Sequence, residues 1–357
     1  MLVMAVALSA CSRDSGEKTV GVSLPKRDVD RWTKDGDDIK KQLEAKGYKV
    51  TLEYADDDSD RQIAQIESMI DAGYQALIIA AKDCYVLNDV LEKAVKKGIK
   101  VIAYDRLIMD TEYVDYYCTF DNYDVGLAQG RYIEEAFQLN AGGYYPGNFQ
   151  VKHGGYPINM ELFSGAADDS TSPECYDGQM SVLGQYIDDG SVVIRSGQTS
   201  FEATAIADWT TENARARMEE LLKQYYSDGA VLDVVLSTND SMALGIIAAL
   251  KQNGYGTDEK PLPVITGMDC DIDSVKAIIN GEQSMSLLID TRALATRVVN
   301  LTDDLLLGNE PKTNDTERFN NGVKVVPTSI CNPIYVDKDN YMEVLVRDGY
   351  YSADDLK

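Results

Sequence analysis

The chain has 357 residues, 44% of them hydrophobic, which is enough material for about two domains with cores of their own. Its 59 acidic and 34 basic residues give a net charge of −25. This charge excludes nucleic acid as a partner, because phosphate contacts need clustered Lys and Arg, and it favours the solubility of an exported or abundant protein. After residue 10, no run reaches the about 20 apolar residues that a membrane-spanning helix needs.

Residues 1–10 form a short apolar run that leads directly into Cys11. The segment Leu8-Ser9-Ala10-Cys11 resembles a bacterial lipobox, in which small residues precede a cysteine that is lipidated and becomes the mature N-terminus. A signal peptide usually opens with positive charge, and no Lys or Arg precedes Arg13, so a chance cysteine is the alternative. We expect residues 1–18 to be a signal sequence and polar tether, with Cys11 as the lipid anchor.

Patterns of strand and helix alternate from Thr19 to Phe120. Glycines stop each of the three helices, at Gly47, Gly73 and Gly98. The predicted strands are Thr19–Leu24, Lys49–Tyr54, Ala76–Ala81, Lys100–Tyr104 and Val114–Phe120. The first helix follows Arg31 and Trp32 and ends at Lys46, and the other two are Asp60–Ala72 and Asn88–Lys97.

The alternation restarts after a helix at Tyr123–Phe137 and a Gly/Tyr-rich stretch, Ala141–Pro157, which we expect to be an exposed loop carrying the single His153. The chain therefore predicts two similar α/β halves, each a doubly wound parallel sheet with right-handed crossovers. The predicted strands are Met160–Ser164, Val192–Ser196, Leu232–Ser237, Val264–Met268 and Met285–Ile289; the helices are Cys175–Tyr186, Thr210–Tyr226, Met242–Asn253, Ile272–Asn280 and Arg292–Leu307; late extended pieces are Gly322–Val326 and Ile334–Val336.

Polar side chains follow the strands of both halves. Asp105 and Arg106 come directly after Lys100–Tyr104, and taken alone they could be an ordinary surface ion pair. In an open α/β sheet, however, ligands bind just outside the carboxyl ends of the strands. Carboxylates accept hydrogen bonds, Arg donates and Asn does both, so these residue types suit a neutral polyol. The other strand-end residues are Lys26, Arg31, Trp32, Asp168, Asp169, Asp208, Trp209, Asn239, Asp240 and Asp269.

Several of these residues have a second interpretation. Trp32 and Trp209 could sandwich the apolar faces of a pyranose, or each could fill a core. Asp240 and Asp269 could cap helices. We prefer the cap for Asp240, whereas Asn239 and Asp269 are the stronger candidates for ligand groups.

Other kinds of site fit the sequence poorly. The chain has no glycine-rich nucleotide loop and no GxSxG nucleophile elbow, and its single histidine argues against a His-based enzyme. Residues 269–273 imitate a calcium loop, but Ser274 and Asn280 replace the required Gly and Glu. We therefore expect no metal and no cofactor. A glycosidase using Asp105 and Asp269 as its carboxyl pair remains a rival, which an assay for sugar release would test.

The remaining five cysteines are far apart and form no CxxC pair, so we expect buried free thiols rather than a disulfide scaffold. They are Cys84, Cys118, Cys175, Cys270 and Cys331.

Six blocks of sequence resemble the periplasmic monosaccharide-binding proteins of ABC transporters, in the multiple-sugar-binding, xylose-binding-like branch. The resemblance extends from Thr19 to Lys357 and is most specific in AYDR, TFDN and GVKVVP. The blocks are SLPKRDVDRW (Ser23–Trp32), QIAQIESMI (Gln62–Ile70), GIKVIAYDRLI (Gly98–Ile108), YYCTFDNYDVG (Tyr116–Gly126), YDGQMSVL (Tyr176–Leu183) and NNGVKVVP (Asn320–Pro327).

The resemblance implies two doubly wound, Rossmann-like lobes joined by a three-crossing hinge, the periplasmic binding protein type I fold. Residues 19–120 with 291–330 would form the N-terminal lobe, and residues 121–290 with 331–357 the C-terminal lobe. It also departs from the family at two positions, since Ser170 stands where relatives have Asn and Ile289 where they have Lys, so the ligand can differ from theirs. The sugar-contacting positions that it implies are Arg31, Trp32, Asp105, Arg106, Asp169, Trp209, Asn239 and Asp269.

The function implied is that of an extracytoplasmic, lipid-anchored binding protein without enzymatic activity. It would capture an aldopentose or aldohexose, such as xylose, arabinose, glucose or galactose, and deliver it to an ABC transporter permease. The alternative is a sugar-sensing input protein for a chemoreceptor or sensor kinase, which would use the same binding residues. We expect a monomer that meets the membrane only through its anchor.

Overall fold

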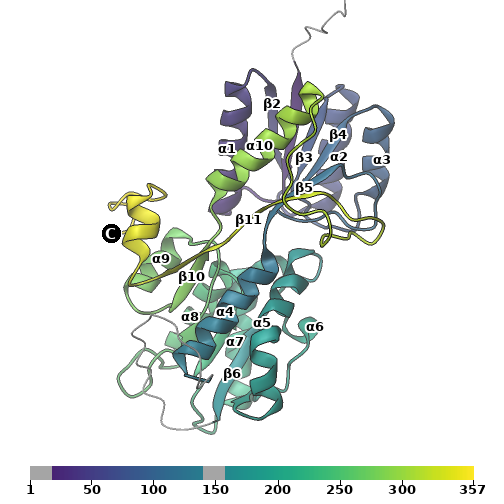
Figure 1. The fold of residues 1–357 in the computed structure, drawn as a ribbon. Helices are drawn as coiled ribbons and strands as arrows, with labels where there is room; N and C mark the ends of the chain where they lie inside the picture. The colour runs from purple at the N-terminus through teal and green to yellow at the C-terminus, as the bar shows by residue number, and fades with distance from the viewer. Residues whose placement is uncertain (1–17, 140–156) are drawn as a thin grey trace, which may run out of the picture.

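The computed structural model describes residues 18–139 and 157–357. The predicted anchor Cys11 and its preceding apolar run lie outside these residues, as does nearly all of the predicted loop Ala141–Pro157 with His153. The described residues form two lobes, which lie one above the other in Figure 1. None of their helices combines the length and the apolar character needed to cross a membrane.

Six of the described strands form the parallel sheet of the first lobe, in the order β11-β5-β4-β3-β1-β2. Apolar residues of α1 and α10 cover one face of this sheet, and those of α2 and α3 cover the other. The strands are β1 (Thr19–Leu24), β2 (Lys49–Tyr54), β3 (Ala76–Ile79), β4 (Lys100–Tyr104), β5 (Tyr116–Phe120) and β11 (Thr328–Cys331); the helices are α1 (Asp30–Ala45), α2 (Ser59–Asp71), α3 (Asn88–Lys96) and α10 (Thr291–Leu307).

Four further described strands form the parallel sheet of the second lobe, in the order β7-β6-β8-β9. One core joins this sheet to α4 and α5, and a second joins it to α7 and α8. The strands are β6 (Ile158–Phe163), β7 (Val192–Val193), β8 (Val234–Ser237) and β9 (Val264–Ile265); the helices are α4 (Asn122–Ala136), α5 (Thr171–Asp188), α6 (Phe201–Thr204), η1 (Ala207–Trp209), α7 (Thr211–Tyr225), α8 (Asp240–Gln252) and α9 (Ile272–Ile279).

The chain passes between the lobes three times. It crosses after β5, between β10 (Met285–Leu288) and α10, and between β11 and β12 (Ile334–Asp337). Strands β10 and β12 pair antiparallel beside the second lobe, and the short helix η2 (Met342–Arg347) follows near the C-terminus. Two doubly wound lobes joined by three crossings are the predicted fold, which is confirmed.

One predicted extended piece is wrong. Gly322–Val326 is not a strand, because Gly322 turns the chain with a φ of +88° and the Asn321 side chain accepts hydrogen bonds from the backbone of Val323 and Lys324. The strand begins later, at Thr328, where pairing with β5 holds the backbone extended. The five cysteines in the described part of the chain are buried and free, as predicted.

Candidate ligand-binding site

A cavity lies between the lobes, where the carboxyl ends of strands from both sheets face each other. All eight predicted binding residues line it, together with other side chains from both lobes. Its volume is only about 80 Å³, because charged side chains of the two lobes pair across it. A wider and more open hollow of about 700 Å³ beside α4 and β12 contains none of the predicted residues, so we assign the site to the smaller cavity.

Arg31, in the first turn of α1, lies at the centre of a cluster of carboxylates. Its guanidinium donates to Asp105, and it lies 3.6 Å from a carboxylate oxygen of Asp35 and 3.6 Å from one of Asp269 in the other lobe. Burial alone would lower the pKa of Arg31, but the three carboxylates outweigh it and raise the pKa well above its ordinary value. Arg31 is therefore a fixed, permanently charged group of donors.

Arg106 makes the second contact between the lobes inside the cavity. Its Nε lies 2.7 Å from Oδ2 of Asp169, and its Nη1 donates to the carbonyl of Ala81 at 3.0 Å. Asp169 is held in turn by the backbone N–H and hydroxyl of Thr171, which donate to its Oδ1 at 3.0 and 2.8 Å. These contacts fix the orientation of both charged groups at the cavity wall.

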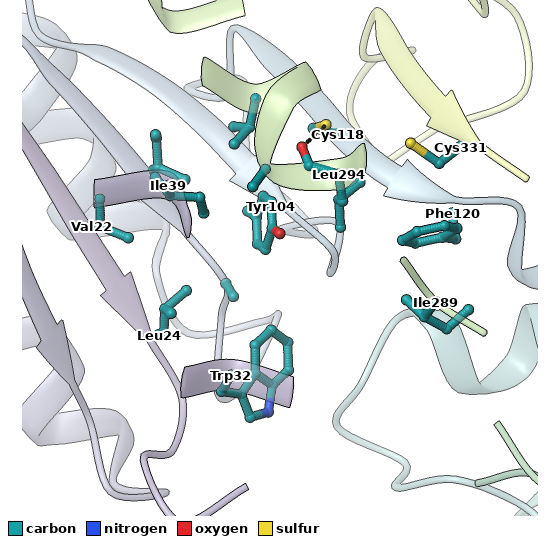
Figure 2. Close-up of a cluster of buried hydrophobic side chains, with 14 of the residues drawn as sticks. Val22, Leu24, Trp32, Ile39, Tyr104, Cys118, Phe120, Ile289, Leu294 and Cys331 are labelled. Atoms are coloured by element: carbon teal, nitrogen blue, oxygen red, sulfur yellow. Dashed lines mark hydrogen bonds between the residues drawn. The ribbon is translucent and has the colours of Figure 1, made fainter. Parts of the chain in front are cut away.

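The two tryptophans lie in the walls on opposite sides of the cleft. Trp32 is 6% exposed and also packs into the core of the first lobe (Figure 2). The guanidinium carbons of Arg31 and Arg106 lie 4.8 and 5.4 Å from the centroid of its ring. Both interpretations of Trp32, core residue and cavity wall, are therefore correct.

The position of the Trp209 ring depends on Gly165. A Cβ at Gly165 would lie 2.1 Å from two ring atoms of Trp209, so only glycine permits this position of the indole. Its Nε1 is buried and has no hydrogen-bond partner among the described residues, although a buried indole N–H usually finds an acceptor. This N–H is available to a hydroxyl oxygen of a ligand.

Asn239 takes the helix cap that was predicted for Asp240 and also keeps its predicted place in the cavity wall. Asn239 is the N-cap of α8, its Oδ1 accepting from the backbone N–H of Met242 at 3.0 Å, so the cap predicted for Asp240 is wrong. The cap leaves the Asn239 amide N–H groups as donors, and Asn239 lines the cavity. Asp240 is buried beneath the wall, where it accepts from Gln283 and Ser286.

Asp269 faces the cavity and does not cap a helix. The N-cap position of α9 belongs to Asp271, and the Asp269 side chain is directed at Arg31 instead. Its Oδ1 is buried and accepts no hydrogen bond from the described residues. Burial raises the pKa of Asp269 above its ordinary value. A hydroxyl donor from a ligand would satisfy this oxygen.

The backbone is strained at this site. Asp105, Asp208, Trp209 and Asp269 have φ angles of 63°, 55°, 56° and 104°, in the region that favours glycine. Such residues each cost on the order of 1–3 kcal/mol and cluster where a protein fixes groups for function. All four line the cavity, which supports its assignment as the functional site.

The search for polar residues at strand ends did not find an apolar part of the cavity wall, which lies near the crossings between the lobes. Phe120 and Ile289 lie there together, so the Ile289 side chain does occupy the cavity wall (Figure 2). Ser170 lies outside the wall, where it accepts from the Cys84 thiol at 3.5 Å, and Thr171 lines the cavity in its place. Polar residues that sequence reasoning did not assign to the site are Asn122, Thr171, Ser241 and Asp57.

Signals for some of these residues were present. Phe120 and Asn122 belong to the TFDN block, and Thr171 and Ser241 stand two residues after Asp169 and Asn239. A helix that begins at the carboxyl end of a strand has its first residues at the same edge of the sheet as the strand end. Extending the list of candidates by two or three residues past each strand end would therefore have included these positions.

Comparison with known proteins gives concordant matches. Residues 20–310 match the family described as the periplasmic binding protein domain. The multiple sugar-binding periplasmic receptor ChvE of Rhizobium radiobacter is 46% identical over 348 residues, which cover 98% of this chain and 94% of the receptor. The D-xylose-binding periplasmic protein of Escherichia coli strain K12 is 31% identical over 357 residues, covering 99% of this chain and 97% of that protein.

A solved structure matches over the same length. An ABC transporter solute-binding protein from Clostridium phytofermentans, with bound β-D-glucose, superimposes with a TM-score of 0.88. Its sequence is 44% identical, and the match covers 95% of this chain and 100% of that one.

Proposed function

The chain belongs to the family of periplasmic binding proteins, in the branch of the multiple-sugar-binding and xylose-binding proteins, and on that premise we propose that it captures a monosaccharide between its two lobes. The ligand class is an aldopentose or aldohexose, such as xylose, arabinose, glucose or galactose. The names of the two relatives and the glucose held by the Clostridium protein support this class.

The observation that carries the proposal is the convergence of eight polar and aromatic residues from two lobes on one cavity. Arg31, Arg106 and the Asn239 amide donate hydrogen bonds, and Asp105, Asp169 and Asp269 accept them. A sugar hydroxyl both donates and accepts, so alternating groups of this kind satisfy it in both directions. Trp32 and Trp209 supply flat apolar surfaces for the C–H faces of the ring.

Transport and anchoring complete the proposal. The protein would lie outside the cytoplasm, tethered by a lipid on Cys11, and present the closed, sugar-bound form to the permease of an ABC transporter without catalysing a reaction. Hinge motion at the three crossings would open and close the lobes. Mass spectrometry of the mature protein tests the anchor, because lipidation predicts a diacylglyceryl mass on an N-terminal Cys11 that the Cys11→Ala variant lacks.

A thermal-shift screen over pentoses, hexoses, uronic acids and short oligosaccharides tests the sugar assignment. A sugar that binds only the folded state raises the melting temperature as its concentration exceeds its Kd. We expect a shift with at least one free pentose or hexose. A screen in which no monosaccharide moves the melting temperature contradicts the proposal.

Calorimetry on Asp105→Ala then tests the site. Removing this carboxylate leaves Arg31 and a sugar hydroxyl without their partner in a buried site, which costs about 1–3 kcal/mol, or roughly tenfold to a hundredfold in affinity. Asp89→Ala is the control, since Asp89 is exposed on α3. Equal sugar affinities of Asp105→Ala and the parent would disprove the assignment of this residue.

A further inference from the structure

Lys82 follows β3 in the first lobe and reaches across the mouth of the cleft. Its Nζ lies 2.7 Å from Oδ2 of Asp168 and 3.1 Å from Oδ1 of Asp208, and both of these acids belong to the second lobe. The Lys82 side chain is only 11% exposed, and it is not among the side chains that line the cavity. One ammonium therefore joins the lobes at the edge of the site without itself lining the cavity.

The two acids that Lys82 holds are the direct neighbours of two cavity residues. Asp168 precedes Asp169, which pairs with Arg106 inside the cavity, and Asp208 precedes Trp209. Asp208 and Trp209 share a turn in which both residues have positive φ angles. Asp169 and Trp209 line the cavity beside the residues that bind Lys82, and Asp208 both lines the cavity and binds Lys82, so the Lys82 ammonium contacts both turns.

On the first-lobe side, the position of Lys82 is linked to the cavity as well. Its backbone N–H donates to Oε1 of the buried Gln62 at 2.8 Å, and Arg106 Nη1 donates to the carbonyls of Ala81 and Lys82 at 3.0 and 3.4 Å. A backbone hydrogen bond from Cys84 to the carbonyl of Asp168, at 3.2 Å, joins the same two segments across the cleft. Arg106 thus connects the cavity to the segment that carries Lys82.

We propose that Lys82 is a positioning residue that holds the lobes closed and slows the release of a bound sugar, although it does not contact the sugar. The effect on release rests on the proposed function, whereas the effect on closure is a property of the chain alone. The Lys82 ammonium is itself shielded from solvent and is shared by two carboxylates, whereas Asp168 and Asp208 are 37% and 46% exposed, so solvent screens the contact in part and its expected contribution is modest. Contacts of this kind act mainly on dissociation rates.

The experiment compares three variants of the full chain. Lys82→Met keeps the length of the side chain but removes its charge, and Lys82→Arg restores the charge. Lys93→Met is the matched control, because Lys93 pairs with Glu67 inside the first lobe. Small-angle X-ray scattering of each sugar-free protein is recorded at about 20 mM and about 500 mM NaCl, where the screening length falls several-fold. Stopped-flow release is measured with D-glucose as the probe.

For Lys82→Met we expect a larger radius of gyration at low salt than for the parent, with little further change at high salt. The release rate of D-glucose should rise roughly fivefold, with an association rate within about twofold of the parent. Lys82→Arg and Lys93→Met should behave like the parent. If Lys82→Met scatters like the parent at both salt concentrations, the proposal is overturned. A parent protein that fails to bind D-glucose counts against glucose as the ligand, and the scattering still decides the role of Lys82.

Discussion

The two walls of the cavity differ in charge. Within the described part of the chain, every basic side chain that lines the cavity belongs to the first lobe, namely Lys26, Arg31 and Arg106. The second lobe contributes the carboxylates of Asp169, Asp208 and Asp269 and no base to this lining. The walls are complementary, so closure of the lobes brings cations of one onto carboxylates of the other, as in the pairs Arg106–Asp169 and Arg31–Asp269.

The walls also differ in how firmly they hold their own groups. Arg31 has two carboxylates within its own lobe, Asp35 and Asp105, and keeps them whether or not the second lobe approaches. Asp269 contacts a charge only across the cleft, and its Oδ1 accepts no hydrogen bond from the described residues. The first wall is therefore assembled in advance, while Asp269 depends on closure and on the ligand, and variants can separate these two properties.

Arg31→Ala is expected to have the largest effect, because it removes the central cation of the first wall. It leaves the Asp105 and Asp269 carboxylates without their common cation in a buried site, and removing one partner of a buried ion pair costs about 3–5 kcal/mol. We expect sugar affinity to fall by more than about a hundredfold and the melting temperature to drop. Calorimetry and thermal unfolding measure the two effects.

Arg27→Ala serves as the control for this variant. Arg27 lies in the same segment and packs on the ring of Tyr54 at 4.3 Å, but it does not line the cavity. A loss of affinity that is equal in Arg27→Ala and Arg31→Ala would show that the segment, and not the Arg31 guanidinium, determines binding.

The sequence predicts which residues line the walls, but it does not predict the buried or distant side chains that these residues pair with. Strand ends were sufficient to find Arg31, Asp105 and Asp269, because parallel strands bring their carboxyl ends to one edge. Asp35 could not be recognised, since an acid inside a helix is usually exposed and this one is buried only by the packing of Tyr104 and Arg31 around it. Lys82 also follows a predicted strand, but its role depends on Asp168, 86 residues away.

Among the helices and strands, too, some are predicted closely from the sequence and others are not. Periodicity located β4 and α2 to within a residue or two, because their apolar faces repeat clearly. Strand β11 was misplaced by several residues, since its extended form depends on pairing with β5, more than two hundred residues earlier. Tertiary pairing of this kind leaves no local signal in the sequence.

Gly165→Ala tests the second wall separately from the first. The added Cβ would lie 2.1 Å from the Trp209 ring, so the indole must leave its place in the second wall while the first wall stays intact. We expect sugar affinity to fall roughly tenfold or more, with a smaller loss of stability than in Arg31→Ala. Calorimetry and the fluorescence of the chain, which has only two tryptophans, report the change.

Gly184→Ala is the matched control in the same lobe. Gly184 lies inside α5, and a Cβ there meets no atom within 4 Å, so this variant should gain about 0.5–1 kcal/mol of stability and keep its affinity. Unchanged affinity and fluorescence in Gly165→Ala would show that Trp209 is not held in the wall by this glycine.

The last prediction concerns stability and not sugar affinity, and it rests on the buried acid behind the first wall. Burial raises the pKa of Asp35 to about 8, against the opposing influence of Arg31 and Tyr104. The unfolded chain loses this proton near pH 4, so between about pH 4 and pH 8 the folded protein holds a proton that the unfolded protein has released. The free energy of unfolding must then decrease as the pH rises through this window, by at most about 1.4 kcal/mol per pH unit from this group.

Asp35→Asn removes this titration and keeps an acceptor for the Tyr104 hydroxyl, which donates to Asp35 in the parent. Glu174, whose pKa burial raises to about 7, contributes a slope of the same sign in both proteins, so the difference between the two isolates Asp35. We expect the melting temperatures to be most similar below about pH 4, where the folded and the unfolded parent both hold the proton, and the Asn variant to be higher by roughly a few degrees near pH 9. Asp37→Asn, an exposed site on the same helix, is the control. Parallel pH profiles for Asp35→Asn and the parent would mean that Asp35 does not take up a proton on folding, and that the first wall carries its full negative charge at neutral pH.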